Sequence, residues 1–428
     1  MSAVRNNAMV RRMGRSTVAT VLTLSLALIA SSALYAKDKK KEKKAPAEQP
    51  TSGYKDKRKF WESLDLSRIV WPNPPAITRI KYVNYWSGEK YVDKSGPKKK
   101  QGWMERMAGV TTGETPDLKP RWQLVVPNGV AVDSKGRAYI ADSKVRAIFI
   151  VNTETGEFEM IKNGSGARFQ WLTGLAIDDG DRLFAADAGL RHVLVFDPHH
   201  KFEGSIAEGM ADPGGLAVDN ENRLLYVADA EQDLVLVYDA DPPYKLLRKI
   251  GKPGTKHTST VPGEFAKPTG VAVDQDGNLY VSDTWNNRVE VFDAEGNFIR
   301  AWGKNGDGPG YFARPKGIAI DSDGHVWVAD AVQDRLQVFT QEGQLLIYLG
   351  GHGILPGQFQ SLANLTIDKN NRVLTTEQFA GRMQIFRYTT TAEARAEKER
   401  RDAEAKKKAE EKRAAKSDAA DAKGPVNK

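Results

Sequence analysis

The sequence predicts an all-β fold, a six-bladed β-propeller of four-stranded antiparallel blades closed by an N-terminal strand. One motif recurs six times at intervals of 41 to 55 residues, and repeats of this length are typical of propellers and solenoids. Within each copy, short segments alternate apolar and polar residues with the period of a β-strand. The sixth copy ends after three strands, and an isolated strand-like segment, residues 77–85, precedes the first copy. That segment can supply the missing outer strand and leave no exposed edge.

The first 36 residues have the order of an export signal. Four arginines precede an uncharged, largely apolar run from Ser16 to Ala36 that contains small residues near its end, which is typical of a secretory signal peptide. A run of this length could instead remain in the bilayer as a signal anchor. We therefore expect an exported protein, either periplasmic or extracellular, or one anchored to the inner membrane.

Residues 37–59 carry ten basic and four acidic side chains and two prolines. This segment is too polar to bury a core, so it predicts a solvated linker. A lysine run close to a membrane could also contact anionic lipid. Residues 1–59 are therefore a candidate for membrane association.

The net charge of +8 belongs to the two ends of the chain. Residues 60–390, the predicted propeller domain, have 37 basic and 42 acidic side chains, a net charge of −5. A domain with this balance does not predict the broad basic face typical of nucleic-acid binding, so we expect no nucleic-acid partner. The chain has no cysteine, which excludes disulfides, Cys-ligated metal centres and a thiol nucleophile.

The fourth copy of the motif shows the strands of one blade most clearly. Short β-branched and aromatic segments lie between Gly270 and Phe292, and Asp276-Gly277 is typical of a tight hairpin turn. Residues 297–302 predict the fourth strand. Between the closing strand and the first blade, residues 87–122 form an inserted loop rich in Gly, Pro and Lys. Long loops without repeat character often carry function, so this loop is a second candidate surface.

The recurring residues carry a family resemblance. The fourth copy reads Pro-Thr-Gly-Val-Ala-Val-Asp from Pro268, then Gly-Asn-Leu-Tyr-Val-Ser-Asp, then Asn-Arg-Val-Glu-Val-Phe-Asp up to Asp293. This pattern resembles the NHL repeat, and the likeness covers residues 127–386. The segment from Trp71 also resembles the lead-in of exported bacterial six-bladed NHL propellers. The resemblance implies the fold and leaves the function open, because similar propellers serve as binding domains, RNA readers, sensor domains, lyases or hydrolases.

Two series of acidic residues recur in every copy, and we expect both to be structural. Carboxylates that return at one place in each blade suit loop capping, in which they accept hydrogen bonds from backbone N–H groups, and do not predict a metal-binding array. The first series ends the innermost strand and comprises Asp133, Asp178, Asp219, Asp274, Asp321 and Asp368. The second series ends the next strand and comprises Asp142, Asp187, Asp229, Asp283, Asp330 and Glu377.

Function is expected where the blades differ. In a four-stranded meander, the loop before the first strand and the loop between the second and third strands lie at one end of the blade, beside the mouth of the central channel. The residue before each repeat glycine therefore lines the mouth. In the sixth copy this residue is Ala363, and Asn364 stands in place of the repeat glycine. Loops after the second acidic series add two aromatic residues, which either pack on neighbouring loops or bind a partner. The predicted ligand-binding residues are Asn128, Thr173, Thr269, Trp285, Lys316, Asn364 and Phe379.

The sequence predicts no catalytic residue, no metal site and no cofactor. In the peptide-amidating lyase, whose fold resembles this one, zinc-binding histidines occupy mouth positions, and none of the six positions here is histidine. The six histidines are scattered over strands and loops, whereas a zinc site needs several that converge. Gly-x-Ser-x-Gly, Walker and His-Glu-x-x-His motifs are absent from the sequence.

Residues 391–428 predict a charged tail. Residues 392–416 consist only of alanine and charged residues, with Glu-to-Lys and Glu-to-Arg pairs at helical spacing that favour a helix. The segment has no apolar seam for a coiled coil. We expect a helical extension that ends in disorder.

These observations predict an exported, non-enzymatic binding or scaffold propeller that presents its channel mouth to a protein, peptide or glycan in the cell envelope. The alternative is a metal-dependent lyase or hydrolase that acts at the central channel. RNA binding conflicts with export and with the acidic domain. The sequence gives no indication of the oligomeric state.

Overall fold

The computed structural model describes residues 64–89, 122–164, 166–253 and 261–421. Every described residue except Leu64 belongs to one compact unit, Asp65–Lys428. The predicted signal or anchor (1–36), the linker (37–59) and all but the ends of the inserted loop lie outside the described residues. No helix in the described ranges is long and apolar enough to cross a membrane.

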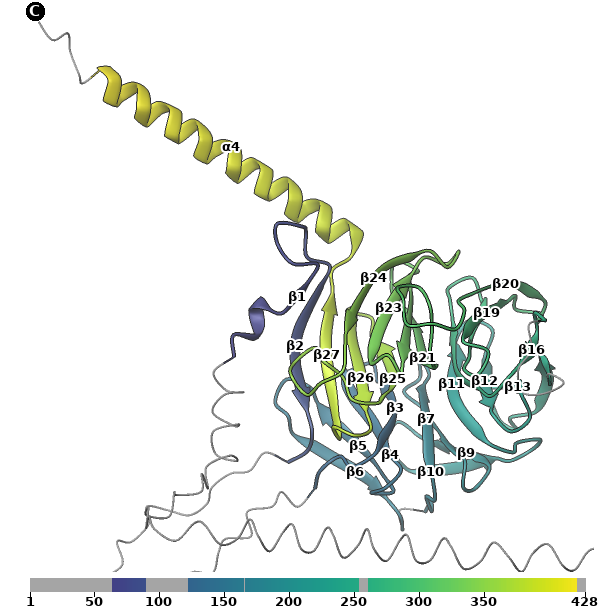
Figure 1. The fold of residues 1–428 in the computed structure, drawn as a ribbon. Coiled ribbons are helices and arrows are strands. Elements are labelled where there is room, and N and C mark those ends of the chain that lie inside the picture. The colour runs from purple at the N-terminus through teal and green to yellow at the C-terminus, as the bar shows by residue number, and fades with distance from the viewer. Residues whose placement is uncertain (1–63, 90–121, 165, 254–260, 422–428) are drawn as a thin grey trace, which may run out of the picture. The chain divides into compact units, whose positions relative to one another are not determined.

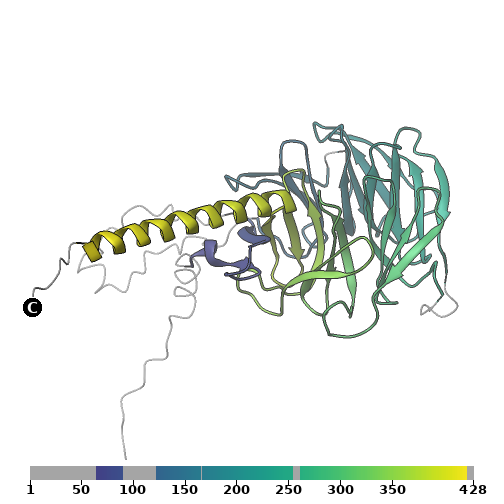
Figure 2. The same ribbon diagram turned by 90° about the horizontal axis from the view of Figure 1, so that it is seen from above.

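Six antiparallel sheets form the blades, which Figures 1 and 2 show side by side. Blade 1 has β3 (Pro127–Val132), β4 (Arg137–Asp142), β5 (Ala147–Asn152) and β6 (Phe158–Lys162), and blade 2 has β7 (Leu172–Ile177), β8 (Leu183–Asp187), β9 (His192–Phe196) and β10 (Phe202–Ile206). Blade 3 has β11 (Pro213–Asp219), β12 (Leu224–Asp229), β13 (Leu234–Asp239) and β14 (Leu246–Ile250), and blade 4 has β17 (Pro268–Val273), β18 (Leu279–Asp283), β19 (Arg288–Phe292) and β20 (Phe298–Trp302). Blade 5 has β21 (Pro315–Ile320), β22 (Val326–Asp330), β23 (Arg335–Phe339) and β24 (Leu345–Gly350), and blade 6 has β25 (Leu362–Ile367), β26 (Arg372–Glu377) and β27 (Arg382–Tyr388). The predicted six-bladed propeller is confirmed.

The ring closes through the N-terminal segment, as predicted. Strand β2 (Ile80–Trp86) pairs antiparallel with β27, from Ile80 opposite Tyr388 to Trp86 opposite Met383. The sequence did not predict β1 (Val70–Trp71), which adds a fifth strand outside β2. The Trp71 ring lies 5.9 Å from the Phe386 ring, so this short strand also covers the apolar side of the last blade.

Apolar side chains fill the spaces between neighbouring blades. One cluster combines Phe184 of blade 2 with Leu225 and Tyr238 of blade 3, and another combines Trp86 of the closing strand with Phe149 of blade 1 and Met383 of blade 6. Because each cluster joins two blades, the core has no interruption at the point where the ring closes. Burial of this apolar surface is the main force that stabilises the ring.

The repeat glycines lie where the innermost strands of adjacent blades approach most closely. A Cβ atom on Gly174 would lie 2.1 Å from the carbonyl oxygen of Gly214, and one on Gly270 would lie 2.1 Å from that of Lys316. No side chain fits at such a distance. The glycine therefore recurs because the inner strands must pack against one another around the channel.

Replacement of Gly270 by alanine is expected to lower the free energy of unfolding by about 1–3 kcal/mol, because the new methyl group forces the inner strands of blades 4 and 5 apart. Urea unfolding followed by tryptophan fluorescence measures this change. Gly204 is the matched control, since a Cβ atom there meets no atom within 4 Å. Equal stability of the Gly270→Ala and Gly204→Ala variants would contradict the steric explanation.

Both acidic series cap loops, as predicted. In the first series, Asp133 Oδ1 accepts hydrogen bonds from the N–H groups of Lys135 and Arg137, at 3.1 and 2.8 Å. In the second, Asp142 is fully buried and accepts four backbone N–H groups, from residues 125, 126, 144 and 145. The second series therefore holds the loop before the first strand against the loop after the second strand.

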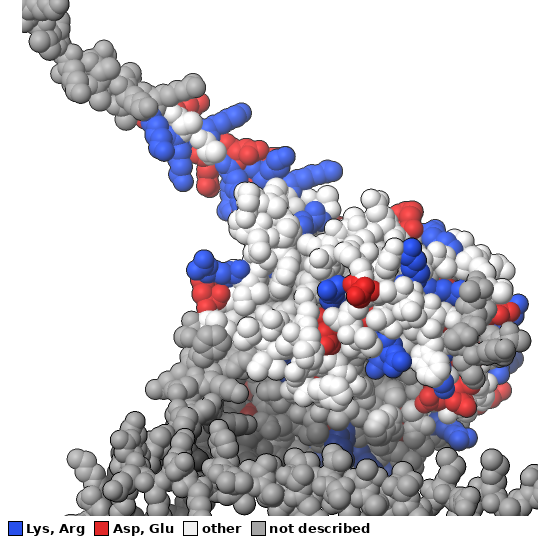
Figure 3. Space-filling view, viewed as in Figure 1, with Lys and Arg blue, Asp and Glu red and all other residues white. Residues whose placement is uncertain are grey.

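Helix α4 (Thr391–Asp421) follows β27 directly, so the predicted helical tail is confirmed up to Asp421. A capping box begins it: the Glu393 N–H donates to Thr390 Oγ1 at 3.2 Å, and the Thr390 N–H donates to Glu393 Oε2 at 2.8 Å. The Thr391 N–H also donates to Asp323 of blade 5 at 2.7 Å. Figure 3 shows basic and acidic side chains interspersed along the described part of this helix.

Candidate functional site

One face of the propeller carries all the predicted site residues, and we call it the mouth face. It is formed by the loops before the first strands and by the loops between the second and third strands. Pairing of Pro127 with Asp142 places these two loops side by side in blade 1, and the Ser143 N–H donates to the Val126 carbonyl oxygen at 3.1 Å. Pairing of Pro315 with Asp330 repeats this arrangement in blade 5.

Two of the predicted polar residues link adjacent blades, and a third, Thr269, bonds within blade 4. Asn128 Nδ2 donates to the Leu172 carbonyl oxygen at 3.0 Å, and Thr173 Oγ1 donates to the Pro213 carbonyl oxygen at 2.8 Å. The Thr269 hydroxyl lies 2.6 Å from that of Thr284. These side chains are half-buried and stabilise the ring around the channel, so only part of their hydrogen-bonding capacity is available to a ligand.

Thr284 and Thr376 continue this set of bonds between blades. Thr284 Oγ1 donates to the Pro315 carbonyl oxygen at 2.7 Å, and Thr376 Oγ1 donates to that of Asn128 at 2.5 Å. The second bond joins blade 6 to blade 1. Sequence reasoning missed both residues, because their hydroxyl groups lie at the ends of second strands and not at the positions before the repeat glycines.

Lys316 differs from the other mouth residues. Its side chain is half-buried, and within the described residues its ammonium group makes no hydrogen bond or ion pair. Burial lowers its pKa, and the nearby charge of Arg314 lowers it further. Asn364 packs against Gly317, the residue that follows Lys316. The Asn364 Oδ1 accepts a hydrogen bond from the Leu365 N–H at 2.8 Å.

Large apolar side chains are exposed on the loops of the mouth face. Phe379 is 85% exposed and Trp285 46%, so the Phe379 ring does not pack on a neighbouring loop. The Lys267 ammonium lies 6.0 Å from the centre of the Trp285 ring. Three further residues on these loops, which the sequence analysis did not select, are Val332 at 61%, Trp171 at 52% and Val125 at 47%. A sequence signal for Trp171 existed, because this residue lies two places before Thr173, which itself precedes the repeat glycine of the second copy.

The charged residues of the mouth face differ from blade to blade. The loops of blade 3 carry Asp212 and Glu231, and burial together with the Asp229 carboxylate raises the pKa of Asp212. Lys267 of blade 4 forms an ion pair with Glu231 at 3.2 Å. Blade 5 carries two cations, Arg314 and Lys316, on the loop and the strand end at the same position of the face.

Metal-ligating side chains do not gather in the described part of the chain, where no group of three or more His, Cys, Asp or Glu residues could hold a cation. The second-series carboxylates are occupied by loop N–H groups. Two of the histidines have separate local partners: His325 Nδ1 lies 3.1 Å from Asp321 Oδ2, and His352 Nδ1 lies 2.7 Å from Asp334 Oδ2. His257 lies outside the described residues.

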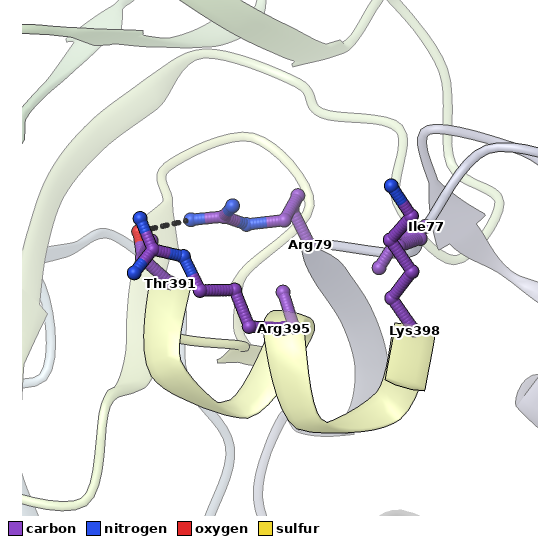
Figure 4. Close-up of a pocket in the computed structure, with 6 residues that line it drawn as sticks. Ile77, Arg79, Thr391, Arg395 and Lys398 are labelled. Atoms are coloured by element: carbon purple, nitrogen blue, oxygen red, sulfur yellow. Dashed lines mark hydrogen bonds between the residues drawn. The ribbon is translucent and has the colours of Figure 1, made fainter. Parts of the chain in front are cut away.

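Two hollows lie at the opposite end of the blades from the mouth. One of about 390 Å³ separates the start of β2 from helix α4 and is lined by Ile77, Arg79, Thr391, Ala394, Arg395 and Lys398. Figure 4 shows Arg79 reaching to Thr391 across it, with Nη2 donating at 3.1 Å to Thr391 Oγ1 and at 2.7 Å to the Tyr388 hydroxyl. A second, of about 270 Å³, lies between hairpins of blades 1 and 6. Arg79 thus ties the helix to the closing strand.

The ends of the inserted loop are fixed on the propeller. The Glu89 N–H donates to the Trp122 carbonyl oxygen at 2.9 Å, and the Lys162 ammonium lies 4.1 Å from the centre of the Trp122 ring. Residues 90–121, which make up most of the second candidate surface, lie outside the described residues.

Comparisons with known proteins agree with this architecture. The family model of the NHL repeat matches residues 265–292 and 312–339, which lie in blades 4 and 5. Among curated relatives, NHL repeat-containing protein 2 of Gallus gallus is 30% identical over 124 residues, 26% of this chain and 16% of the relative. A probable peptidyl-alpha-hydroxyglycine alpha-amidating lyase of Caenorhabditis elegans is 37% identical over 92 residues, 20% of this chain and 24% of the relative. The chain thus spans a quarter or less of the length of these relatives.

A solved structure shares the fold at low identity. A structural genomics protein of unknown function from Bacteroides thetaiotaomicron is 16% identical and has a TM-score of 0.50, with 63% of this chain and 71% of that chain covered. Identity this low supports the fold alone. The protein is a six-bladed β-propeller that contains NHL repeats.

Proposed function

We propose that the protein is a non-enzymatic binding propeller that presents its mouth face to a protein, peptide or glycan partner in the cell envelope. The observation that carries the proposal is the set of exposed apolar residues on mouth-face loops of five blades: Val125, Trp171, Trp285, Val332 and Phe379. Loops in water favour polar residues, and large exposed apolar groups that share a face are typical of interaction surfaces. The export-like sequence of residues 1–36 supports a location in the envelope.

Removal of the two exposed aromatic rings is expected to weaken partner capture strongly. The Trp285→Ala/Phe379→Ala variant should bind its partner at least about tenfold more weakly, because exposed aromatic residues are the usual energetic centres of interfaces. Cross-linking in cells with the full chain, followed by quantification of each cross-linked species, measures this effect.

The control replaces exposed apolar residues away from the mouth. Leu247 of β14 and Leu346 of β24 lie on outer strands and are 45% and 47% exposed, so the Leu247→Ala/Leu346→Ala variant removes similar apolar surface. It should keep the wild-type cross-linked species. Equal cross-linking by both double variants and the wild type would reject the mouth face as the binding surface.

The alternative function is that of a metal-dependent lyase or hydrolase. The local likeness of this chain to the probable amidating lyase of Caenorhabditis elegans supports this alternative. A cation that binds only the folded state at 100 times its Kd would add about 2.7 kcal/mol to the free energy of unfolding. We expect calcium and zinc to leave the melting temperature unchanged, because loop N–H groups already occupy the carboxylates of the second acidic series. A rise in melting temperature with either ion would favour the enzyme.

A further inference from the structure

Two cations of blade 5 have no side-chain partner among the described residues. Arg314 is exposed and Lys316 is half-buried, and neither side chain forms a hydrogen bond or ion pair with a described residue. They are two residues apart, on either side of Pro315 at the start of β21, and the charge of Arg314 lowers the pKa of Lys316. Placing like charges together and partly out of water costs free energy, which an anionic group would recover.

The Asp330 carboxyl group, on the strand residue opposite Pro315, is already engaged by backbone N–H groups. Asp330 is fully buried, and its Oδ1 accepts the N–H groups of Arg314 and Val332 at 3.1 and 3.0 Å. Lys267, at the same position in blade 4 as Arg314, is instead paired with Glu231. Blade 5 therefore carries positive charge that the described residues leave uncompensated.

Apolar groups adjoin these cations. Because one Asp330 carboxylate holds both the Arg314 and the Val332 backbone, the exposed Val332 side chain belongs to the same small region as Arg314. The corresponding loops of the flanking blades 4 and 6 present Trp285 and Phe379. We call these five residues, Trp285, Arg314, Lys316, Val332 and Phe379, the blade-5 patch.

We propose that the blade-5 patch binds a peptide segment of the partner that places a carboxylate beside an apolar side chain. The carboxylate, from Asp, Glu or a chain end, pairs with Lys316 and Arg314, and the apolar side chain contacts Trp285, Val332 or Phe379. This inference rests on the proposed binding function of the mouth face and adds the chemistry of the partner. Charge complementarity of this kind sets the choice of partner and the register of binding.

Selection from a phage-displayed library of random peptides, with the immobilised full chain, tests the proposal. Peptides captured by the wild type should be enriched in Asp or Glu next to aromatic or aliphatic residues. Synthetic copies should bind the Lys316→Glu and Arg314→Glu variants at least about tenfold more weakly, and their affinity for the wild type should fall as salt rises. Arg314 is exposed, so its variant is expected to fold even if Lys316→Glu does not.

Lys144→Glu is the matched control. Lys144 is an exposed cation on the mouth-face loop of blade 1. This variant therefore changes the net charge by the same amount as Arg314→Glu, and on the same face, but leaves blade 5 intact. It should bind the selected peptides within about twofold of the wild type, since an exposed charge on another blade is screened by salt.

The outcomes separate the two proposals. The carboxylate proposal would be overturned if the captured peptides lacked acidic enrichment, or if Lys144→Glu and Arg314→Glu weakened peptide binding equally. In either case, loss of capture by the Trp285→Ala/Phe379→Ala variant would still support the binding function of the mouth face. If that aromatic variant captured peptides as well as the wild type does, both the mouth-face function and the carboxylate proposal would be overturned. Displacement of the peptides by single-stranded RNA, with the same dependence on Arg314, would assign the patch to nucleic acid and overturn the peptide proposal.

Discussion

Replacement of Asp142 by alanine is expected to destabilise the propeller by about 3–5 kcal/mol, because each buried N–H group left without its charged acceptor costs about 1–3 kcal/mol. The fully buried carboxylate accepts N–H groups of residues 125, 126, 144 and 145 at 2.6 to 3.0 Å. Alanine provides no acceptor for any of them. Urea unfolding of the full chain measures the loss.

The control for this variant is Asp276→Ala. Asp276 is exposed in a hairpin turn of blade 4, and its replacement should change the free energy of unfolding by no more than about 0.5 kcal/mol. Asp142→Asn keeps one carbonyl acceptor and should lie between the two. If Asp142→Ala were as stable as Asp276→Ala, the loop-capping role of the second acidic series would be wrong.

The Glu290→Gln variant is expected to be more stable than the wild type at pH 8 and to match it more closely at pH 5. Glu290 is fully buried on β19, and burial raises the pKa of its carboxyl from 4.5 to about 7 although Arg288 opposes the shift. A raised carboxyl pKa stabilises the fold below pH 4.5, and this stabilisation is lost as the pH rises through 7. The loss amounts to at most about 3 kcal/mol for a shift of this size.

Neighbouring blades show why glutamine suits this position. Gln337 of blade 5 accepts the Gly310 N–H at 2.8 Å and donates to the Tyr311 carbonyl oxygen at 2.7 Å. Glu290 accepts the Gly263 N–H in the same way at 2.7 Å, but an ionised carboxylate cannot donate the second bond. In blade 4, Arg288 Nη2 lies 2.5 Å from Glu290 Oε1 and donates to the Glu264 carbonyl oxygen at 2.9 Å. Glutamine at position 290 keeps the acceptor for the Gly263 N–H at every pH and removes the buried charge, at the loss of the ion pair with Arg288.

Urea unfolding of the wild type and Glu290→Gln at pH 5 and pH 8 checks this prediction. Glu221→Gln, at an exposed position of blade 3, controls for the loss of one carboxylate and should follow the wild type at both pH values. Parallel pH profiles for the wild type and Glu290→Gln would show instead that Glu290 stays ionised beside Arg288 throughout this range.

The recurring residues made most of the fold predictable from the sequence. The two acidic series and the repeat glycines appear in nearly every blade, and hydrogen bonding and close packing need the same residue at each place. Strand β1 escaped prediction because a two-residue strand is too short to show a period. The buried position shared by Glu290, Gln337 and Gln384 escaped because polar residues within a strand look like exposed ones until the loop that covers them is known.

The candidate site was predictable only in outline. Meander topology correctly placed Trp285, Phe379 and Lys316 on one face, but it could not show that Asn128 and Thr173 are engaged in bonds between blades. It also gave no reason to choose Trp171 or Val125, whose exposure depends on how each loop folds against its neighbour.

The sequence by itself therefore determined the six blades, the closure by an N-terminal strand and the residues of the mouth face, because periodicity and repetition are local properties of the chain. Only the tertiary structure decided which mouth residues are already satisfied and which, such as Lys316 and Arg314, lack a partner among the described residues. That difference depends on burial and on contacts between blades far apart in sequence, and no local pattern records it.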